Sequence, residues 1–200
     1  MKSVLISIQP KWCELIASGK KTVEVRKTKP KLDVPFKVYV YMTKEYNRGV
    51  NSCFYFYKSG KVIGEFVCNN IDWHGLNNLI VKEDAEHTLS GTCLTKEEVL
   101  NYLNYQKGTN IYACKNYDFY GWHISDLKIY DKPKELGEFV VEGDCLNGDC
   151  KKCKWFDGGN NYNVEADCLL PYDFHFNKTV KPLFRPPQSW CYVESEVTEG

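Results

Sequence analysis

The chain has 200 residues, of which 43% are hydrophobic and 14% aromatic, and its formal net charge is zero. These values exclude a disordered chain and predict one globular domain over residues 1–200. A neutral charge balance argues against a strongly basic protein that binds nucleic acid without specificity.

The first 26 residues predict a strand, a helix and a second strand. Val4 to Ile8 has the pattern of a short strand, and Pro10 then fits the first turn of a helix. Gly19 is the expected end of that helix. Three apolar residues at helical spacing predict its buried face, namely Trp12, Leu15 and Ile16.

The next segments predict mostly β structure. After a loop rich in proline and lysine, Phe36 to Tyr41 is strongly strand-like. Two further runs, Phe54 to Tyr57 and Lys61 to Val67, predict a hairpin with its turn at Ser59-Gly60.

One more helix and a final strand follow. Thr95 precedes Glu98 by three residues, which is a capping box and predicts a helix over residues 94–103. The β pattern returns after Gly108, and SWCYVE near the C-terminal end predicts the last strand. Many short strands with few helices indicate a mostly β member of the α+β class. We therefore expect a small, mostly closed β-barrel with helices at its ends.

The start of the chain and the cysteines bear on its compartment. MKSVLISIQP contains only a short apolar run, so we expect no signal peptide, and no stretch is long and apolar enough to span a membrane. We therefore predict a cytoplasmic protein whose ten cysteines are reduced.

Residues 141–184 form a separate stretch rich in Gly, Asn, Asp and Cys, which we predict to be an insert before the last strand. Its cysteines include a C-x-x-C pair of the kind that binds tetrahedral zinc. The predicted ligands of a structural zinc are Cys145, Cys150, Cys153 and Cys168. His175 or Cys191 is an alternative ligand, and a loop of unliganded thiols is the alternative to a metal site.

The strand within SGKKTVEVRK carries charges of both signs. Glu24 and Arg26 alternate with Val23 and Val25, so the charged and apolar side chains should lie on opposite faces. We expect the valines to face the core, with Thr22, Glu24 and Arg26 on the outward face and Lys21 at the turn. A glutamate can orient an arginine fork that holds a phosphate in two bonds. The alternative is a solvated strand face with weak ion pairs.

The charges are unevenly distributed along the chain. Residues 1–37 hold nine Lys or Arg and three acids, a balance of plus six, whereas residues 141–200 hold six basic and ten acidic side chains, a balance of minus four. A basic surface on one part of a neutral protein is therefore compatible with these numbers.

The same strand carries a resemblance to a known family. Gly19, Lys21, Glu24 and Arg26 match G-x-K-x-x-E-x-R, the hallmark of the ASCH domain family. Residues 121–139 and 185–194 resemble phage and Firmicute members of that family. The resemblance implies a PUA-like β-barrel with flanking helices, in which this motif lines a cleft between the barrel and the first helix.

The family is thought to bind or act on RNA, so the resemblance implies an RNA or a nucleotide as the partner and no membrane. Lys21 and Arg26 would hold phosphate, and Glu24 would orient Arg26 or accept from a base edge. An aromatic side chain would stack on the base. Further residues predicted to line this site come from family-like segments, namely Trp122, His123, Ser189 and Trp190.

The alternative is a hydrolase that uses the same cleft. Some small members remove the acyl group from acetylated cytidine with a lysine, a threonine nucleophile and a glutamate, and another is described as a ribonuclease. Lys21 matches the lysine, Glu24 stands at the threonine position, and Thr22 is the nearest hydroxyl. These three residues are the candidate catalytic groups. A third possibility is an interaction protein of a phage or mobile element with an idle cleft.

Overall fold

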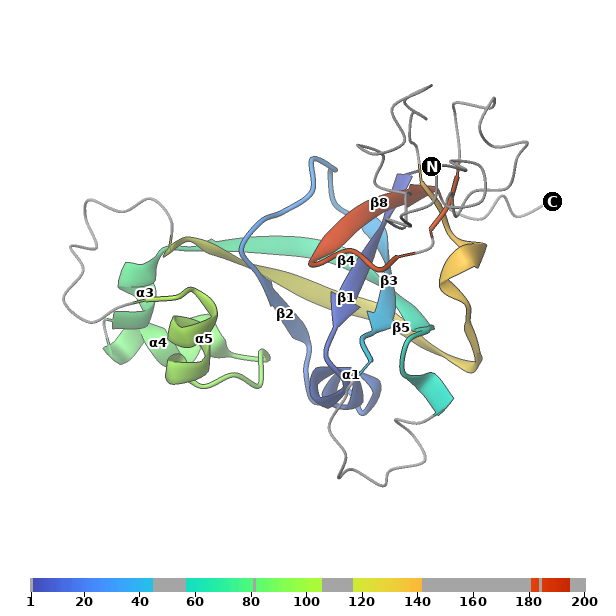
Figure 1. The fold of residues 1–200 in the computed structure, drawn as a ribbon. Coiled ribbons are helices and arrows are strands. Elements are labelled where there is room, and N and C mark those ends of the chain that lie inside the picture. The colour runs from blue at the N-terminus through green and yellow to red at the C-terminus, as the bar shows by residue number, and fades with distance from the viewer. Residues whose placement is uncertain are drawn as a thin grey trace, which may run out of the picture.

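The structure, a computed structural model, describes residues 2–44, 57–80, 82–105, 117–141, 181–183 and 185–194. Six strands form one mixed sheet in the order β2-β5-β4-β3-β1-β8 (Figure 1). They are β1 (Lys2–Ile8), β2 (Val23–Arg26), β3 (Phe36–Met42), β4 (Val62–His74), β5 (Phe119–Lys134) and β8 (Trp190–Glu194). The short strands β6 (Val140–Val141) and β7 (Lys181–Pro182) pair with each other.

The helices lie in two places. Helix α1 (Pro10–Ala17) lies at the ends of β1 and β2, whereas α3 (Leu76–Ile80), α4 (Lys82–Leu89) and α5 (Lys96–Tyr102) gather beside the edge that carries β2 (Figure 1). A short 3-10 helix, η2 (Leu136–Glu138), follows β5. None of the helices in the described residues is long and apolar enough to cross a membrane.

The predicted strand, helix and second strand are confirmed as β1, α1 and β2. Gly19 ends the helix with φ +72°, and its N–H donates to the Ile16 carbonyl at 2.9 Å. The prediction for the buried helix face is partly wrong. Pro10, Cys13 and Ile16 are buried, whereas Trp12 is only half-buried, because the sheet covers the face one residue further round the helix.

The predicted hairpin around Ser59-Gly60 is not the pairing in the described part of the chain. Residues 54–56 lie outside it, and Tyr57 and Lys58 are helical. The Gly60 N–H donates to the Met42 carbonyl at 2.8 Å, so this turn places the start of β4 beside the end of β3. Strand β4 pairs antiparallel with both β3 and β5.

The capping box is confirmed at the start of α5. The Glu98 N–H donates to Thr95 Oγ1 at 3.1 Å, and the Thr95 N–H donates to Glu98 Oε2 at 2.9 Å. The helix buries Val99 and ends at a buried Leu103. The predicted last strand is also confirmed, since β8 pairs antiparallel with β1.

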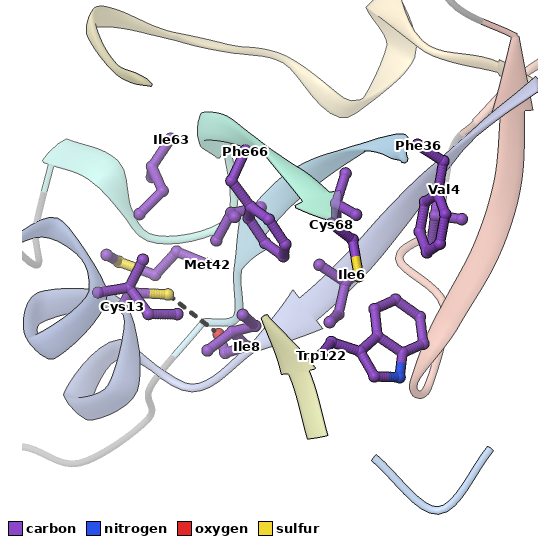
Figure 2. Packing of buried hydrophobic residues seen from close by; sticks show 13 residues of the cluster. Val4, Ile6, Ile8, Cys13, Phe36, Met42, Ile63, Phe66, Cys68 and Trp122 are labelled. Atoms are coloured by element: carbon purple, nitrogen blue, oxygen red, sulfur yellow. Dashed lines mark hydrogen bonds between the residues drawn. The ribbon is translucent and has the colours of Figure 1, made fainter. Parts of the chain in front are cut away.

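The main core lies on one face of the sheet, between the strands and α1. Directly paired residues of neighbouring strands share a face, so Val4, Val38 and Phe66 form one row across β1, β3 and β4. Cys13 of α1 packs into this core, where its thiol donates to the Ile8 carbonyl at 3.6 Å (Figure 2). Burial raises the pKa of the Cys13 thiol far above its usual range.

Strand β2 separates its charged and apolar side chains as predicted, and all four of its residues are buried, so only the prediction that the charged face points outward is wrong. Glu24 pairs with Trp122, which belongs to the main core, so the charged side chains face inward. Val25 faces the other way and packs with Leu79 and Phe119 in a second cluster under α3 and α5. Alternation alone could not show that helices cover the valine face.

The predicted barrel is supported as a mostly β fold with a six-stranded sheet. Among the described residues, no backbone pairing joins the edge strands β2 and β8. A side-chain bridge lies between these edges, where Trp190 Nε1 donates to Thr28 Oγ1 at 3.0 Å. Most of the predicted cysteine-rich insert, with Cys145, Cys150, Cys153 and Cys168, lies outside the described residues.

Candidate functional site

A cleft of about 760 Å³ opens where α1, α5 and β2 meet. Ligand-binding clefts in proteins typically enclose about 300–1,000 Å³. Lys21, Glu24 and Arg26 all line it, so the fold brings together three of the predicted site residues. The walls come from the start of α1, from α5 and from the segment before β8, and they include Gln9, Trp12, Asn101, Tyr102, Pro187 and Gln188.

Lys21 is positioned by the end of α1 and by the loop after α4. Gly19 allows the tight turn after which the Lys21 N–H donates to the Leu15 carbonyl at 3.0 Å. Gly91 then packs against Thr22, where a Cβ atom would collide with the hydroxyl, and its carbonyl accepts from the Thr22 N–H at 2.8 Å. This contact places the Thr92 carbonyl 2.6 Å from Lys21 Nζ.

Glu24 lies between the two cations. Its Oε2 is 3.3 Å from Lys21 Nζ, and its Oε1 is 3.0 Å from Arg26 Nη2. The three side chains are only 1%, 9% and 8% exposed, in the order Lys21, Glu24, Arg26. These are therefore buried ion pairs, and the alternative of a solvated strand face is wrong.

Arg26 also fastens β2 to the far side of the sheet. Its Nη2 donates to the Ser7 carbonyl of β1 at 2.7 Å, and its Nη1 makes a longer contact of 3.4 Å with Ser189 Oγ. Arg26 Nε is buried and has no hydrogen-bond partner among the described residues. Two cations against one carboxylate leave the three groups with a formal charge of plus one in a desolvated place.

Two aromatic side chains line the cleft beside its charged floor, which is formed by Lys21, Glu24 and Arg26. Trp12 projects from α1, and its ring centroid is 5.4 Å from Lys21 Nζ and 4.2 Å from Lys11 Nζ. Tyr102 lines the cleft from α5, and burial raises the pKa of its hydroxyl. Lys11 and Glu98 form a 3.1 Å ion pair that joins α1 to α5 at the rim.

Trp122, His123 and Thr22 do not reach the cleft. Trp122 is fully buried in the main core, so its indole is not available for stacking on a base (Figure 2). His123 faces the other side of β5, where its Nε2 lies 2.6 Å from Asp72 Oδ2. Thr22 is exposed and covers Gly91, which leaves it outside the lining.

Ser189 and Trp190 lie beside the cleft. Ser189 contacts Arg26, which lines the cleft, and the Trp190 ring packs edge-to-face against Tyr192 at a centroid distance of 5.4 Å. Helical spacing assigned Trp12 to the core, and no feature of the sequence singled out Tyr102. The helical spacing gave no signal for Trp12, because tertiary packing decides that the sheet buries the face of α1 that carries Cys13 and Ile16.

The profile of the ASCH domain family matches residues 6–118, which is more than half of the chain. This chain belongs to the ASCH domain family. ASCH domains are a PUA-like fold family associated with RNA binding. The match includes α1, β2 and α5 and therefore most of the cleft. No protein with a curated description matches the sequence significantly.

Several solved structures resemble the ASCH domain described above. ASCH from Zymomonas mobilis has 20% identity and a TM-score of 0.49, over 97% of this chain and 89% of that chain. A mutant of the Zymomonas mobilis protein has 23% identity and a TM-score of 0.43, over 68% and 77%. The N-terminal domain of Staphylothermus marinus McrB has 8% identity and a TM-score of 0.39, over 68% and 77%.

Within the described residues, no group of three or more His, Cys, Asp or Glu side chains could hold a metal ion. The predicted zinc ligands lie outside these residues, so the zinc site stays a prediction. The resemblance to phage and Firmicute members in particular also stays a prediction.

Proposed function

We propose that this ASCH domain is a non-enzymatic module that binds RNA or a nucleotide in the cleft lined by Lys21, Glu24 and Arg26. The observation that carries the proposal is the buried, uncompensated positive charge at the cleft floor. Burying a charge is costly unless a counter-charge accompanies it. A phosphate in the cleft would supply that counter-charge.

The walls suit the rest of a nucleotide. Aromatic faces stack on bases of any sequence, and Trp12 and Tyr102 offer two such rings in one cleft. Gln9, Asn101 and Gln188 are amides, which can both donate to and accept from a base edge. Glu24 already binds both cations, so its role is to orient Arg26 and Lys21 rather than to receive a proton.

The test is to change the cleft charge in both directions. Glu24→Gln raises the formal charge of the three groups from plus one to plus two, and Arg26→Met lowers it to zero. For charges about 6 Å apart, one unit of charge changes the affinity for a phosphate by roughly threefold to a hundredfold. Lys37→Met is the matched control, because Lys37 is 42% exposed on β3 and does not line the cleft.

The measurement is binding of a single-stranded hexaribonucleotide near physiological salt. We expect affinity in the order Glu24→Gln, wild type, Arg26→Met, with Lys37→Met equal to wild type. Both cleft variants should be less stable than wild type, and partial unfolding would weaken binding in both. Partial unfolding therefore cannot explain tighter binding by Glu24→Gln. Equal affinity of all four proteins would show that the cleft does not bind the phosphate.

The same samples separate binding from hydrolysis. After prolonged incubation, we expect the hexaribonucleotide to be recovered intact. Product that forms with wild type and is lost in Lys21→Met would show that the cleft is a hydrolase site, and the proposal of a non-enzymatic module would be wrong.

A further inference from the structure

The segment that follows β2 carries three lysines at alternate positions, Lys27, Lys29 and Lys31, which we call the lysine track. All three are exposed. Among the described residues, none of their ammonium groups is paired with a carboxylate within 4.0 Å. The track begins one residue after Arg26, so it continues directly from the cleft floor.

Aromatic side chains hold the lysine track in place. Lys27 Nζ lies 5.0 Å from the ring centroid of Tyr102, which lines the cleft, and Lys29 Nζ lies 5.8 Å from that of Tyr120. The Lys31 N–H donates to the Tyr192 hydroxyl at 2.7 Å. The ammonium groups of Lys27 and Lys29 are therefore positioned over rings, and the backbone of Lys31 is fixed by a hydrogen bond.

An exposed aromatic residue continues the same row across the sheet. Arg26 pairs with Tyr120, and Tyr120 pairs with Trp73, so the three side chains share one face of β2, β5 and β4. Trp73 is 58% exposed, which is unusual for a tryptophan. The row thus leads from the cleft to an indole face that is open to solvent.

We propose that the lysine track and Trp73 bind the part of a single-stranded RNA that extends beyond the nucleotide in the cleft. This inference rests on the proposed function, and it specifies a strand of several nucleotides as the ligand. The Cα atoms of the three lysines span at most about 14 Å, so their flexible side chains can follow successive phosphates. Positive grooves interleaved with aromatic rings are the usual means of binding single strands.

The first test uses the variant Lys27→Gln, Lys29→Gln, Lys31→Gln, with a nucleoside monophosphate and a hexaribonucleotide as ligands. Each phosphate contact on a single strand contributes about 0.7 to the slope of log affinity against log salt, so three lost contacts reduce the slope by about 2. If the proteins bind equally at 1 M salt, this corresponds to roughly a hundredfold weaker hexamer binding at 0.1 M. Binding of the monophosphate should be unchanged.

A matched control removes the same charge elsewhere. The variant Lys37→Gln, Lys128→Gln, Lys132→Gln alters three exposed lysines on β3 and β5 and should bind the hexamer like wild type. For the aromatic part, Trp73→Ala should weaken hexamer binding roughly 5- to 150-fold. Tyr57→Ala, which removes another aromatic ring that is 55% exposed, should have no effect.

The outcomes distinguish the two proposals. If the track variant keeps the wild-type affinity and salt slope while Arg26→Met loses hexamer binding, the cleft proposal stands and the track proposal is wrong. If neither changes hexamer binding, both are wrong. If a hexaglutamate peptide binds wild type as tightly as the hexaribonucleotide does, the surface recognises acidic peptides and the track proposal is wrong.

Discussion

Glu24→Gln should destabilise the protein even though it changes only one atom of the side chain. Glu24 is 9% exposed and lies 3.3 Å from Lys21 Nζ and 3.0 Å from Arg26 Nη2. Without its negative charge, two buried cations face each other. Removing one partner of a buried ion pair costs about 3–5 kcal/mol of unfolding free energy. For a chain of this size, that corresponds to a melting temperature lower by roughly 6–20 °C.

The assay is urea unfolding followed by circular dichroism, with Glu135→Gln as the matched control. Glu135 Oε1 is only 2.7 Å from Lys61 Nζ, but the two side chains are 65% and 31% exposed. An exposed ion pair contributes about 0–1 kcal/mol, so the control should lose no more than that. The Glu135–Lys61 pair is shorter than the pairs of Glu24 but should contribute less to the unfolding free energy, because burial rather than distance sets the cost of losing a charge.

A loss of less than about 1 kcal/mol in Glu24→Gln would refute this reasoning, since it would place the pair among exposed ones. A loss of equal size in both variants would do the same. Far-ultraviolet spectra of the folded variants should match that of wild type, because neither substitution changes side-chain volume appreciably.

Three further predictions concern other parts of the molecule. Val25→Asp would bury an unpaired charge in the cluster under α3 and α5 and should prevent folding near 37 °C. The control Val34→Asp, at a side chain that is 43% exposed, should melt like wild type. A normal melting curve for Val25→Asp would contradict the assigned facing of β2. Burial lowers the pKa of His74 below its ordinary value of 6.5, so the unfolded chain binds this proton more readily and stability should fall as the pH drops below about 6.5. In His74→Gln the melting temperature should therefore change less between pH 7 and pH 5 than it does in wild type. An unaltered pH dependence would show that another group causes the loss of stability. Metal analysis of purified protein should find one zinc per chain, reduced in Cys150→Ser, and metal-free wild type would exclude the zinc site.

Local chemistry in the sequence was sufficient for several elements. Thr95 and Glu98 satisfy each other's backbone donors within a single turn, so the start of α5 needs no distant partner. Gly19 adopts a positive φ that other residues rarely take, which made the end of α1 predictable. The alternation in β2 correctly separated its charged side chains from its valines.

Tertiary contacts decided that both faces of β2 are buried. Glu24 and Arg26 are buried because β2 pairs with β5 beside the core residue Trp122, and Val25 is buried because helices from residues 76–103 cover it. A period of two identifies two faces but cannot say which one a distant segment will cover. Trp122 was predicted to line the site because it lies in a family-like segment, but it lies in the core.

The candidate site divides in the same way. A short motif, G-x-K-x-x-E-x-R, was enough to predict Lys21, Glu24 and Arg26 as site residues through the resemblance to the ASCH domain family, whereas their spacing alone left a solvated strand face as the alternative. The structure alone revealed Trp12 and Tyr102 as the walls and Thr92 as the anchor of Lys21, because these residues are up to 90 positions apart and meet only when α5 and its preceding loop pack against α1 and β2. The sequence by itself therefore determined the charges of the cleft floor, whereas long-range packing determined their burial.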